Sequence, residues 1–101
     1  LNTMIKIDYT VQGRLGWCAR ACSIIVQSCI YTKSMCKYRI VNRPPDSNRE
    51  PLREGNLKSI MDILMGAASK GTVVEISIEG PDEVEVEKAV KRALILAEGV
   101  K

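Results

Sequence analysis

Three segments of the chain alternate apolar and polar residues with period two, and this pattern constrains the fold more than any other feature. The segments span residues 4–11, 35–41 and 72–79. Because successive side chains of a strand point to opposite faces, each segment predicts a strand with one buried and one solvated face. Such strands are typical of antiparallel sheets that are covered on one side only.

Apolar residues recur at helical spacing between and after these strands. The spacing predicts helices over residues 18–31, 57–68 and 82–97, the last with Asp82 as N-cap and Glu85 completing a capping box. The second helix is expected to be short, with Leu57, Ile60, Met61, Leu64 and Ala68 along one face, and to be closed by Lys70 and Gly71. The order of elements predicts the α+β class, with a mostly antiparallel sheet and helices on one face.

Residues 42–55 interrupt this pattern. The segment reads NRPPDSNREPLREG, with three prolines, several charges and almost no apolar side chain. It predicts an exposed inserted loop, with an edge strand around Leu52 as the alternative. A length of 101 residues is that of one domain, so residues 1–101 are expected to form a single domain that contains this loop.

The chain contains no histidine, and this excludes several kinds of chemistry. Ser-His-Asp and Cys-His catalysis, histidine metal ligands and phosphohistidine all need an imidazole. The cysteines Cys18, Cys22, Cys29 and Cys36 include no C-x-x-C pair, so zinc-ribbon and thioredoxin-type sites are not predicted. We expect no metal and no cofactor.

The charge distribution favours an acidic or phosphate-bearing partner. The net charge is only +3, but residues 1–58 carry ten Lys and Arg against four Asp and Glu. Aromatic residues make up 4%, too few for base-stacking platforms, so direct nucleic-acid binding is not expected. No apolar run reaches the length of a membrane span and the start shows no signal-peptide pattern. We expect a cytoplasmic monomer without membrane insertion.

Two segments resemble a known family. Residues 56–94 read NLKSIMDILMGAASKGTVVEISIEGPDEVEVEKAVKRAL, and residues 15–22 read LGWCARAC. The first is similar to the K-S-I-M helix, the G-x-x-I-x-I strand and the G-x-D-E helix start of HPr, the phosphocarrier family of the bacterial phosphoenolpyruvate:sugar phosphotransferase system. The second is similar to the family's active-site loop L-G-L-H-A-R-P-A. The resemblance implies an open-faced sandwich of four antiparallel strands and three helices, and a protein that is not itself an enzyme.

The resemblance places Cys18 at the position of the family's phosphorylated histidine and retains the following arginine as Arg20. Three interpretations of Cys18 remain open. It can be a structural replacement in a regulatory paralogue, a phosphoryl acceptor in a working carrier, or a redox thiol together with Cys22. A helix N-terminus favours an anion by about 0.3–1 kcal/mol, so a Cys18 thiolate assisted by Arg20 is a candidate nucleophile. We rank the regulatory paralogue first and the redox sensor last.

Ser59 stands where regulatory members of the family carry a serine that HPr kinase phosphorylates with ATP. Its structural interpretation is an N-cap of the second helix, with Asp62 completing a Ser-x-x-Asp box and repelling a phosphate. The two roles are compatible. We predict a phosphorylation-controlled binding module of sugar uptake or carbon regulation, with Ser59 as the switch and phosphoryl transfer by Cys18 as the alternative.

The resemblance also implies a docking surface beside the active-site loop. Its partners would be Enzyme I, sugar permease components, HPr kinase or a transcriptional regulator. Met61 and Met65 are predicted to form it and Trp17 to join them, because Met side chains adapt to different partners. Ile60 and Leu64 are assigned to the core, and Cys22 and Cys29 are expected to be small buried apolar residues.

Overall fold

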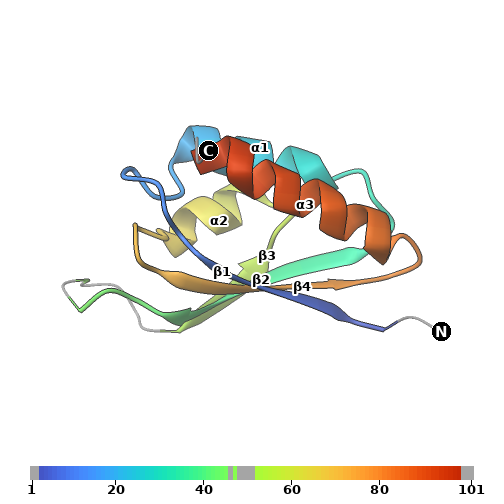
Figure 1. Ribbon diagram of the computed structural model, residues 1–101, viewed down its shortest axis with the longest axis horizontal. Helices are drawn as coiled ribbons and strands as arrows, with labels where there is room; N and C mark the ends of the chain where they lie inside the picture. The colour runs from blue at the N-terminus through green and yellow to red at the C-terminus, as the bar shows by residue number, and fades with distance from the viewer. Residues whose placement is uncertain (1–2, 46, 48–51, 99–101) are drawn as a thin grey trace.

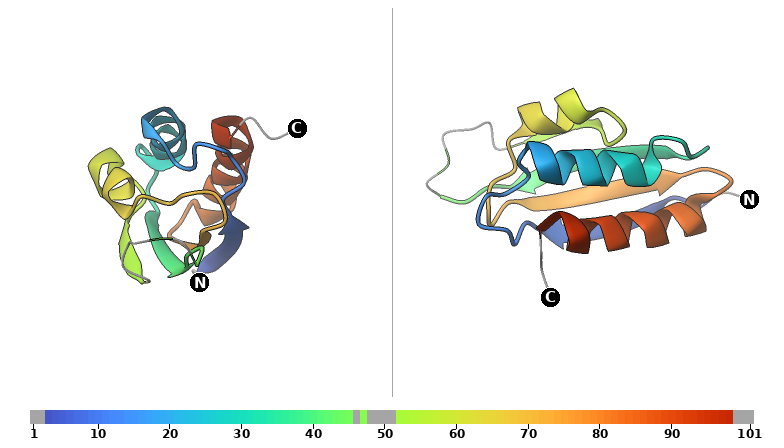
Figure 2. Two further views of the ribbon diagram at one scale, coloured as in Figure 1. Left: turned by 90° about the vertical axis from the view of Figure 1, so that its left-hand side faces the viewer. Right: turned by 90° about the horizontal axis from the view of Figure 1, so that it is seen from above.

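The computed structural model describes residues 3–45, 47 and 52–98. The described elements follow in the order β1 (Ile5–Thr10), α1 (Ala19–Cys29), β2 (Met35–Asn42), β3 (Arg53–Asn56), α2 (Ile60–Gly66), β4 (Val73–Glu79) and α3 (Glu83–Glu98). The strands form one antiparallel sheet in the order β1-β4-β2-β3. The helices cover one face of the sheet and leave the other open (Figures 1 and 2). The predicted α+β class and open-faced sandwich are confirmed.

The alternating strands place their apolar side chains beneath the helices. Ile76 in β4 pairs with Ile7 of β1 on one side and with Tyr38 of β2 on the other. These three side chains are buried in the core, whereas the intervening residues Lys37 and Glu75 lie on the open face. Truncating a fully buried Ile to Ala typically costs about 2–5 kcal/mol, so these buried side chains contribute much to the stability of the protein.

The longest helix, α3, packs against α1 (Figure 1). Its buried stripe consists of Val86, Val90, Ala93, Leu94 and Ala97. The carboxylate of Asp82, the predicted N-cap, accepts hydrogen bonds from Lys33 N at 2.9 Å and Ser34 Oγ at 2.5 Å, which tie the start of α3 to the α1–β2 turn. None of the described helices is long and apolar enough to cross a membrane.

Helix α2 is short and buries Ile63 rather than Ile60. It starts at Ile60, directly after the predicted N-cap Ser59, and Ala67 in the left-handed conformation (φ 50°) ends it before Lys70. Ile63 is 1% exposed, whereas Ile60, assigned to the core by sequence, is 37% exposed. The helical spacing of apolar residues fits both faces, and only the tertiary contacts select between them.

The predicted 42–55 loop is corrected at its C-terminal end. Arg53, Glu54 and Gly55 belong to β3, which pairs with Lys37–Ile40 of β2 at the edge of the sheet. The sequence offered an edge strand near this place only as an alternative, around Leu52, because backbone pairing with β2 holds β3 and its side chains show no apolar alternation. Residues 46 and 48–51 of the predicted loop lie outside the described part of the chain.

Candidate functional site

Ser59 caps the N-terminus of α2. Its backbone is extended (φ −112°, ψ 113°) and its hydroxyl Oγ accepts a hydrogen bond from Asp62 N at 3.2 Å. The predicted N-cap is confirmed, but the capping box is only half formed. Ser59 N donates to Asn56 O at 3.1 Å, and the Asp62 carboxylate accepts from Asn56 N at 2.9 Å. The side chain of Ser59 is partly exposed, so its hydroxyl lies at the surface beside free helix N–H groups.

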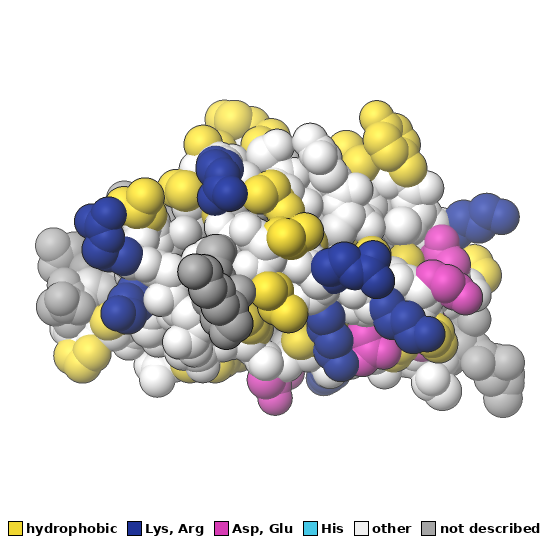
Figure 3. Space-filling model, turned by 45° about the horizontal axis from the view of Figure 1, so that its top comes forward, with side chains coloured by type: hydrophobic (Ala, Val, Ile, Leu, Met, Phe, Trp, Pro, Cys, Tyr) yellow, Lys and Arg dark blue, Asp and Glu magenta, His cyan; other side chains and the backbone are white. Residues whose placement is uncertain are grey.

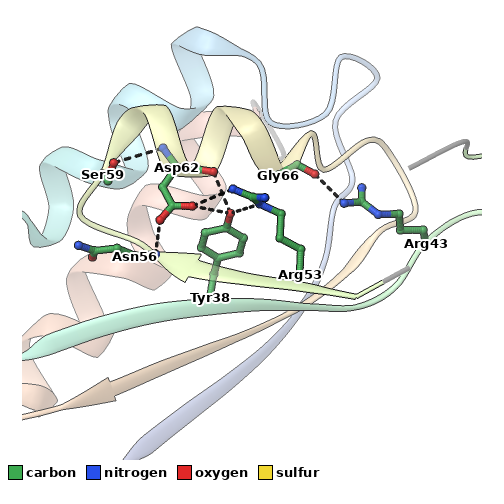
Figure 4. A network of polar contacts seen from close by, with 7 residues as sticks. All are labelled: Tyr38, Arg43, Arg53, Asn56, Ser59, Asp62 and Gly66. Carbon is green, nitrogen blue, oxygen red and sulfur yellow. Dashed lines mark hydrogen bonds and ion pairs between the residues drawn. The ribbon is translucent and has the colours of Figure 1, made fainter. Parts of the chain in front are cut away.

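The carboxylate of Asp62 is held by a network of polar contacts (Figure 4). Arg53 Nη2 lies 3.2 Å from Asp62 Oδ1 and forms an ion pair with it. The hydroxyl of Tyr38 donates to the backbone carbonyl of Asp62 at 2.8 Å and accepts from Arg53 Nε at 3.2 Å. Burial raises the pKa of Tyr38, so the phenol stays protonated and can donate. The negative charge nearest to Ser59 along the helix is therefore compensated by Arg53.

A close approach of backbone and side chain makes this network possible. Gly55 lies directly beneath the Asp62 carboxylate, and a side chain at position 55 would collide with it. The sequence analysis named neither Arg53 nor Tyr38 as a site residue. The arginine content of the 42–55 segment was the only indication of Arg53. Tyr38 gave no indication, because its place in an alternating segment is typical of an ordinary buried strand residue.

A second arginine holds the other end of α2. Arg43 donates from Nη1 to Ala67 O at 3.1 Å and from Nη2 to Gly66 O at 2.8 Å (Figure 4). A cation at a helix C-terminus satisfies orphan carbonyls and interacts favourably with the helix dipole. The segment predicted to be an exposed loop thus supplies, through Arg43 and Arg53, polar contacts at both ends of the helix that carries Ser59.

An apolar surface patch adjoins Ser59. It consists of Ile60, Met61 and Met65, which are 37%, 65% and 63% exposed. Apolar side chains stand out on the helix-bearing side of the molecule shown in Figure 3. Leu64 is partly buried against the core, in line with its predicted role. Met61 and Met65 are thus available at the surface, as the predicted docking role requires.

Cys18 occupies the N-cap position of α1. The preceding loop is fixed by Gly16, whose left-handed backbone (φ 64°) passes so close to Ala68 that a side chain there would clash. Trp17 N donates to Ala68 O at 2.8 Å, and Cys22 N closes the first helical turn on Cys18 O at 2.9 Å. The Cys18 side chain makes no capping hydrogen bond and is partly exposed. Its thiol therefore lies at a helix N-terminus without serving as a cap.

A pocket of about 230 Å³ opens beside Cys18. Arg14 and Arg20 line it together with Cys18, and both arginines are exposed. The far wall includes Glu98, whose carboxylate accepts from Gln12 N and Gly13 N at 2.9 Å each and from the Tyr9 hydroxyl. The sequence analysis missed Glu98, because nothing in the sequence shows that the end of α3 meets the loop after β1.

The docking role predicted for Trp17 is wrong. Its side chain is 3% exposed and stacks on Tyr9 with ring centroids 6.3 Å apart. The apolar ring is covered because the Gly16 turn directs it into the core, beneath the loop that carries Cys18. Its indole Nε1 has no hydrogen-bond partner among the described residues. Trp17 thus supports the loop from within.

The remaining cysteines are buried. Cys22 and Cys29 are fully covered, as predicted, and all four thiols, including those of Cys18 and Cys36, are free. The Sγ of Cys22 donates to Trp17 O at 3.2 Å, and burial raises the pKa of Cys22 to about 11. Within the described residues, no group of three or more Cys, Asp or Glu side chains could hold a metal ion.

Comparison with known proteins gives consistent matches along the chain. The family model PTS-HPr, described as the PTS HPr component phosphorylation site, matches residues 5–95. The phosphocarrier protein HPr of Xylella fastidiosa is 36% identical over 80 residues, which are 79% of each chain. That of Neisseria meningitidis is 36% identical over 86 residues, 85% of each chain. The crystal structure of HPr-C-His from Thermoanaerobacter tengcongensis superimposes with a TM-score of 0.74 at 27% identity, over 96% of this chain and 98% of that one.

Proposed function

This chain belongs to the PTS-HPr family of phosphotransferase-system proteins, and from this premise we propose that it is a regulatory binding module switched by phosphorylation of Ser59. Members of this family are phosphocarriers rather than catalytic enzymes. A chain without histidine cannot form phosphohistidine, so any phosphoryl group here must be held by another side chain. Ser59 and Cys18 are the two candidates that the geometry offers.

The compensated charge around Ser59 is the observation that carries the proposal. Asp62 would repel a phosphate on Ser59, but its carboxylate is paired with Arg53 and bonded by Asn56 N. The phosphate oxygens can take over the hydrogen bond that Asp62 N now donates to Ser59 Oγ. Because phosphate at a helix N-terminus meets the positive end of the helix dipole, the modification is compatible with an intact α2.

The transfer itself would be an ordinary phosphoryl transfer from ATP. The Ser59 oxygen bonds to the γ-phosphorus, the bond between that phosphorus and ADP breaks, and a base of the kinase takes the hydroxyl proton. The product carries a charge of about −2 near the exposed patch of Ile60, Met61 and Met65. A partner that binds this patch would thus meet a neutral serine beside it before phosphorylation and a strongly negative phosphate beside it afterwards.

The partners follow from the same proposal. They are the cytoplasmic components of the phosphotransferase system, Enzyme I and the sugar permease components, together with HPr kinase or a transcriptional regulator. The exposed side chains of Met61 and Met65 would provide an adaptable contact surface for them.

Cys18 supports a second candidate function, that of a phosphoryl carrier. The pocket beside it holds Arg14 and Arg20, which could neutralise an incoming phosphoryl group. The Cys18 sulfur would bond to the phosphorus while the bond to the donor in Enzyme I breaks. We rank this function second, because Cys18 replaces the histidine that performs the step in the family. A redox role with Cys22 ranks third, since the Cys22 thiol is fully buried.

Phosphorylation of the purified chain tests the proposal. HPr kinase and ATP should add one phosphoryl group, which peptide mapping should locate on Ser59. Ser59→Ala should abolish the modification, whereas the control Ser69→Ala, which removes an exposed hydroxyl beyond the far end of α2, should leave it intact. Phosphate on another residue of the wild type, or none, would contradict the proposed switch.

A further inference from the structure

A second pocket lies at the end of the sheet where β2 begins and β3 ends. Its volume is about 450 Å³, within the range of sites that hold small ligands. It is distinct from the pocket beside Cys18, with which it shares no lining residue. Its wall includes the three lysines Lys33, Lys37 and Lys58 together with Glu54 and Asn56.

The strand register explains why these charges converge. Lys37 of β2 pairs with Asn56 at the end of β3, so the two side chains stand side by side on the open face of the sheet. Lys33 approaches from the turn before β2, and Lys58 from the turn that leads into α2. Residues far apart in the sequence thus bring three lysines to the lining of one concave surface.

The walls of the pocket are fixed by hydrogen bonds. Lys33 N and Ser34 Oγ both donate to the Asp82 carboxylate, which pins the turn before β2. Lys58 Nζ donates to Thr32 O at 2.9 Å, and Lys58 N to the Asn56 side chain at 2.9 Å. A site with prepositioned walls loses less conformational entropy when a ligand binds.

The lysines of this pocket outnumber the acidic residues among its described lining residues. None of the three forms an ion pair with a carboxylate in the described part of the chain, where the salt bridges belong to Arg39, Arg53 and Lys91. Glu54 is the only acidic residue among the described residues of the lining, so the three lysines leave an excess of positive charge. An anionic ligand would supply the missing partners.

We propose that this pocket binds a small phosphate ester of about the size of a sugar phosphate. Lysine ammonium groups bind phosphate oxygens as point charges, and three of them suit a dianionic group better than a single carboxylate. Asn56, beside Lys37, can hydrogen-bond to the hydroxyl groups of the ester. The proposal rests on this pocket alone and does not depend on phosphorylation of Ser59.

Titration of the full chain, followed by the chemical shifts of its backbone amides, tests this site. The probes are glucose 6-phosphate, inorganic phosphate and glucose. We expect glucose 6-phosphate to produce saturable shifts at residues 33–37 and 54–58, and glucose to produce none. Inorganic phosphate should bind at the same residues but more weakly if the organic part contributes contacts. Equal affinity for the two phosphates would contradict the assignment to a phosphate ester.

Charge variants separate binding in the pocket from general attraction to a basic protein. Lys37→Gln should raise the dissociation constant for glucose 6-phosphate about tenfold. Lys88→Gln removes an exposed lysine from α3, on the covered side of the sheet, and should change it less than about twofold. Glu54→Gln removes the only acidic group of the lining and should tighten binding, a gain that damage to the fold would not produce.

Three further results would overturn the proposal. The first is the absence of saturable shifts for glucose 6-phosphate in the wild type. The second is shifts that centre on residues 14–20, and the third is an equal weakening of binding in Lys37→Gln and Lys88→Gln. The amide spectrum reports in the same experiment whether each variant is folded.

Discussion

The Arg53 guanidinium and the Asp62 carboxylate lie 3.2 Å apart and join the edge strand β3 to the first turn of α2. Each side chain is 29% exposed, so the pair is partly shielded from solvent. Arg53 also donates to the Tyr38 hydroxyl, which in turn donates to the backbone of α2. The helix that carries Ser59 is therefore fastened to the sheet by polar contacts as well as by Ile63.

Replacement of Arg53 by alanine should destabilise the protein by about 1 kcal/mol, since it leaves Asp62 without its cation and Tyr38 without a donor. Urea denaturation measures the change. The matched control is Arg39→Ala, whose ion pair with Glu75 is more exposed, at 52% for the arginine. We expect less than about 0.5 kcal/mol there. An equal effect of both substitutions would show that the Arg53 network adds nothing to an ordinary surface pair.

Glu98 should hold the loop between β1 and α1. The substitution Glu98→Ala removes the acceptor for Gln12 N, Gly13 N and the Tyr9 hydroxyl and should cost about 1–3 kcal/mol. Hydrogen exchange at Gln12 and Gly13 should accelerate more than exchange in β4. The exposed Glu85 provides a control, and Glu85→Ala should leave both amides protected. Unchanged exchange in Glu98→Ala would mean that the loop is held by other contacts.

Truncation of a side chain should change the stability of the protein much more on one face of α2 than on the other. Ile63→Ala removes a side chain that is 1% exposed and should cost about 2–5 kcal/mol in urea denaturation. Met65→Ala removes one that is 63% exposed and should change stability by less than about 0.5 kcal/mol. If the exposed patch contacts the kinase, Met65→Ala should instead slow phosphorylation of Ser59. A large loss of stability in Met65→Ala would contradict the assignment of the faces.

Ionisation of the Cys22 thiol should lower the stability of the folded protein at alkaline pH. Burial raises the pKa of this thiol from 9.0 to about 11, so the folded state favours the protonated form. The resulting stabilisation is complete below pH 9 and is lost as the pH rises through about 11. Between about pH 8 and pH 10.5 the wild type should lose about 2 kcal/mol more than Cys22→Ala. Parallel pH profiles for the two proteins would contradict this contribution.

Local patterns in the sequence predicted most of the fold. The alternation of the strands and the apolar stripe of α3 are patterns of residue spacing within a single element, and both recur as burial patterns in the structure. The strand β3 was predicted only as an alternative around Leu52, because its place depends on backbone pairing with β2 rather than on side chains. The buried face of α2 was also misassigned, since Ile60 and Ile63 are equally apolar and only the tertiary contacts distinguish them.

The candidate site was predictable only in part. Ser59 and Cys18 were singled out by the resemblance of their segments to the family, and the structure has both residues at N-cap positions. The residues that surround them come from distant parts of the chain. Arg53 reaches Asp62 across the β3–α2 turn, and Glu98 reaches Gly13 across 85 positions of sequence. Trp17 was misplaced because its burial is decided by the Gly16 turn.

The most direct test of the central claim compares the two phosphoryl donors on the same protein by ³¹P NMR, which distinguishes phosphate on oxygen from phosphate on sulfur. One sample is incubated with HPr kinase and ATP, the other with Enzyme I and phosphoenolpyruvate. Our account predicts a serine phosphate signal in the first sample, absent in Ser59→Ala, and no protein-bound phosphate in the second. A sulfur-bound phosphate in the second sample, lost in Cys18→Ala, would contradict it and make Cys18 the phosphoryl acceptor of a working carrier.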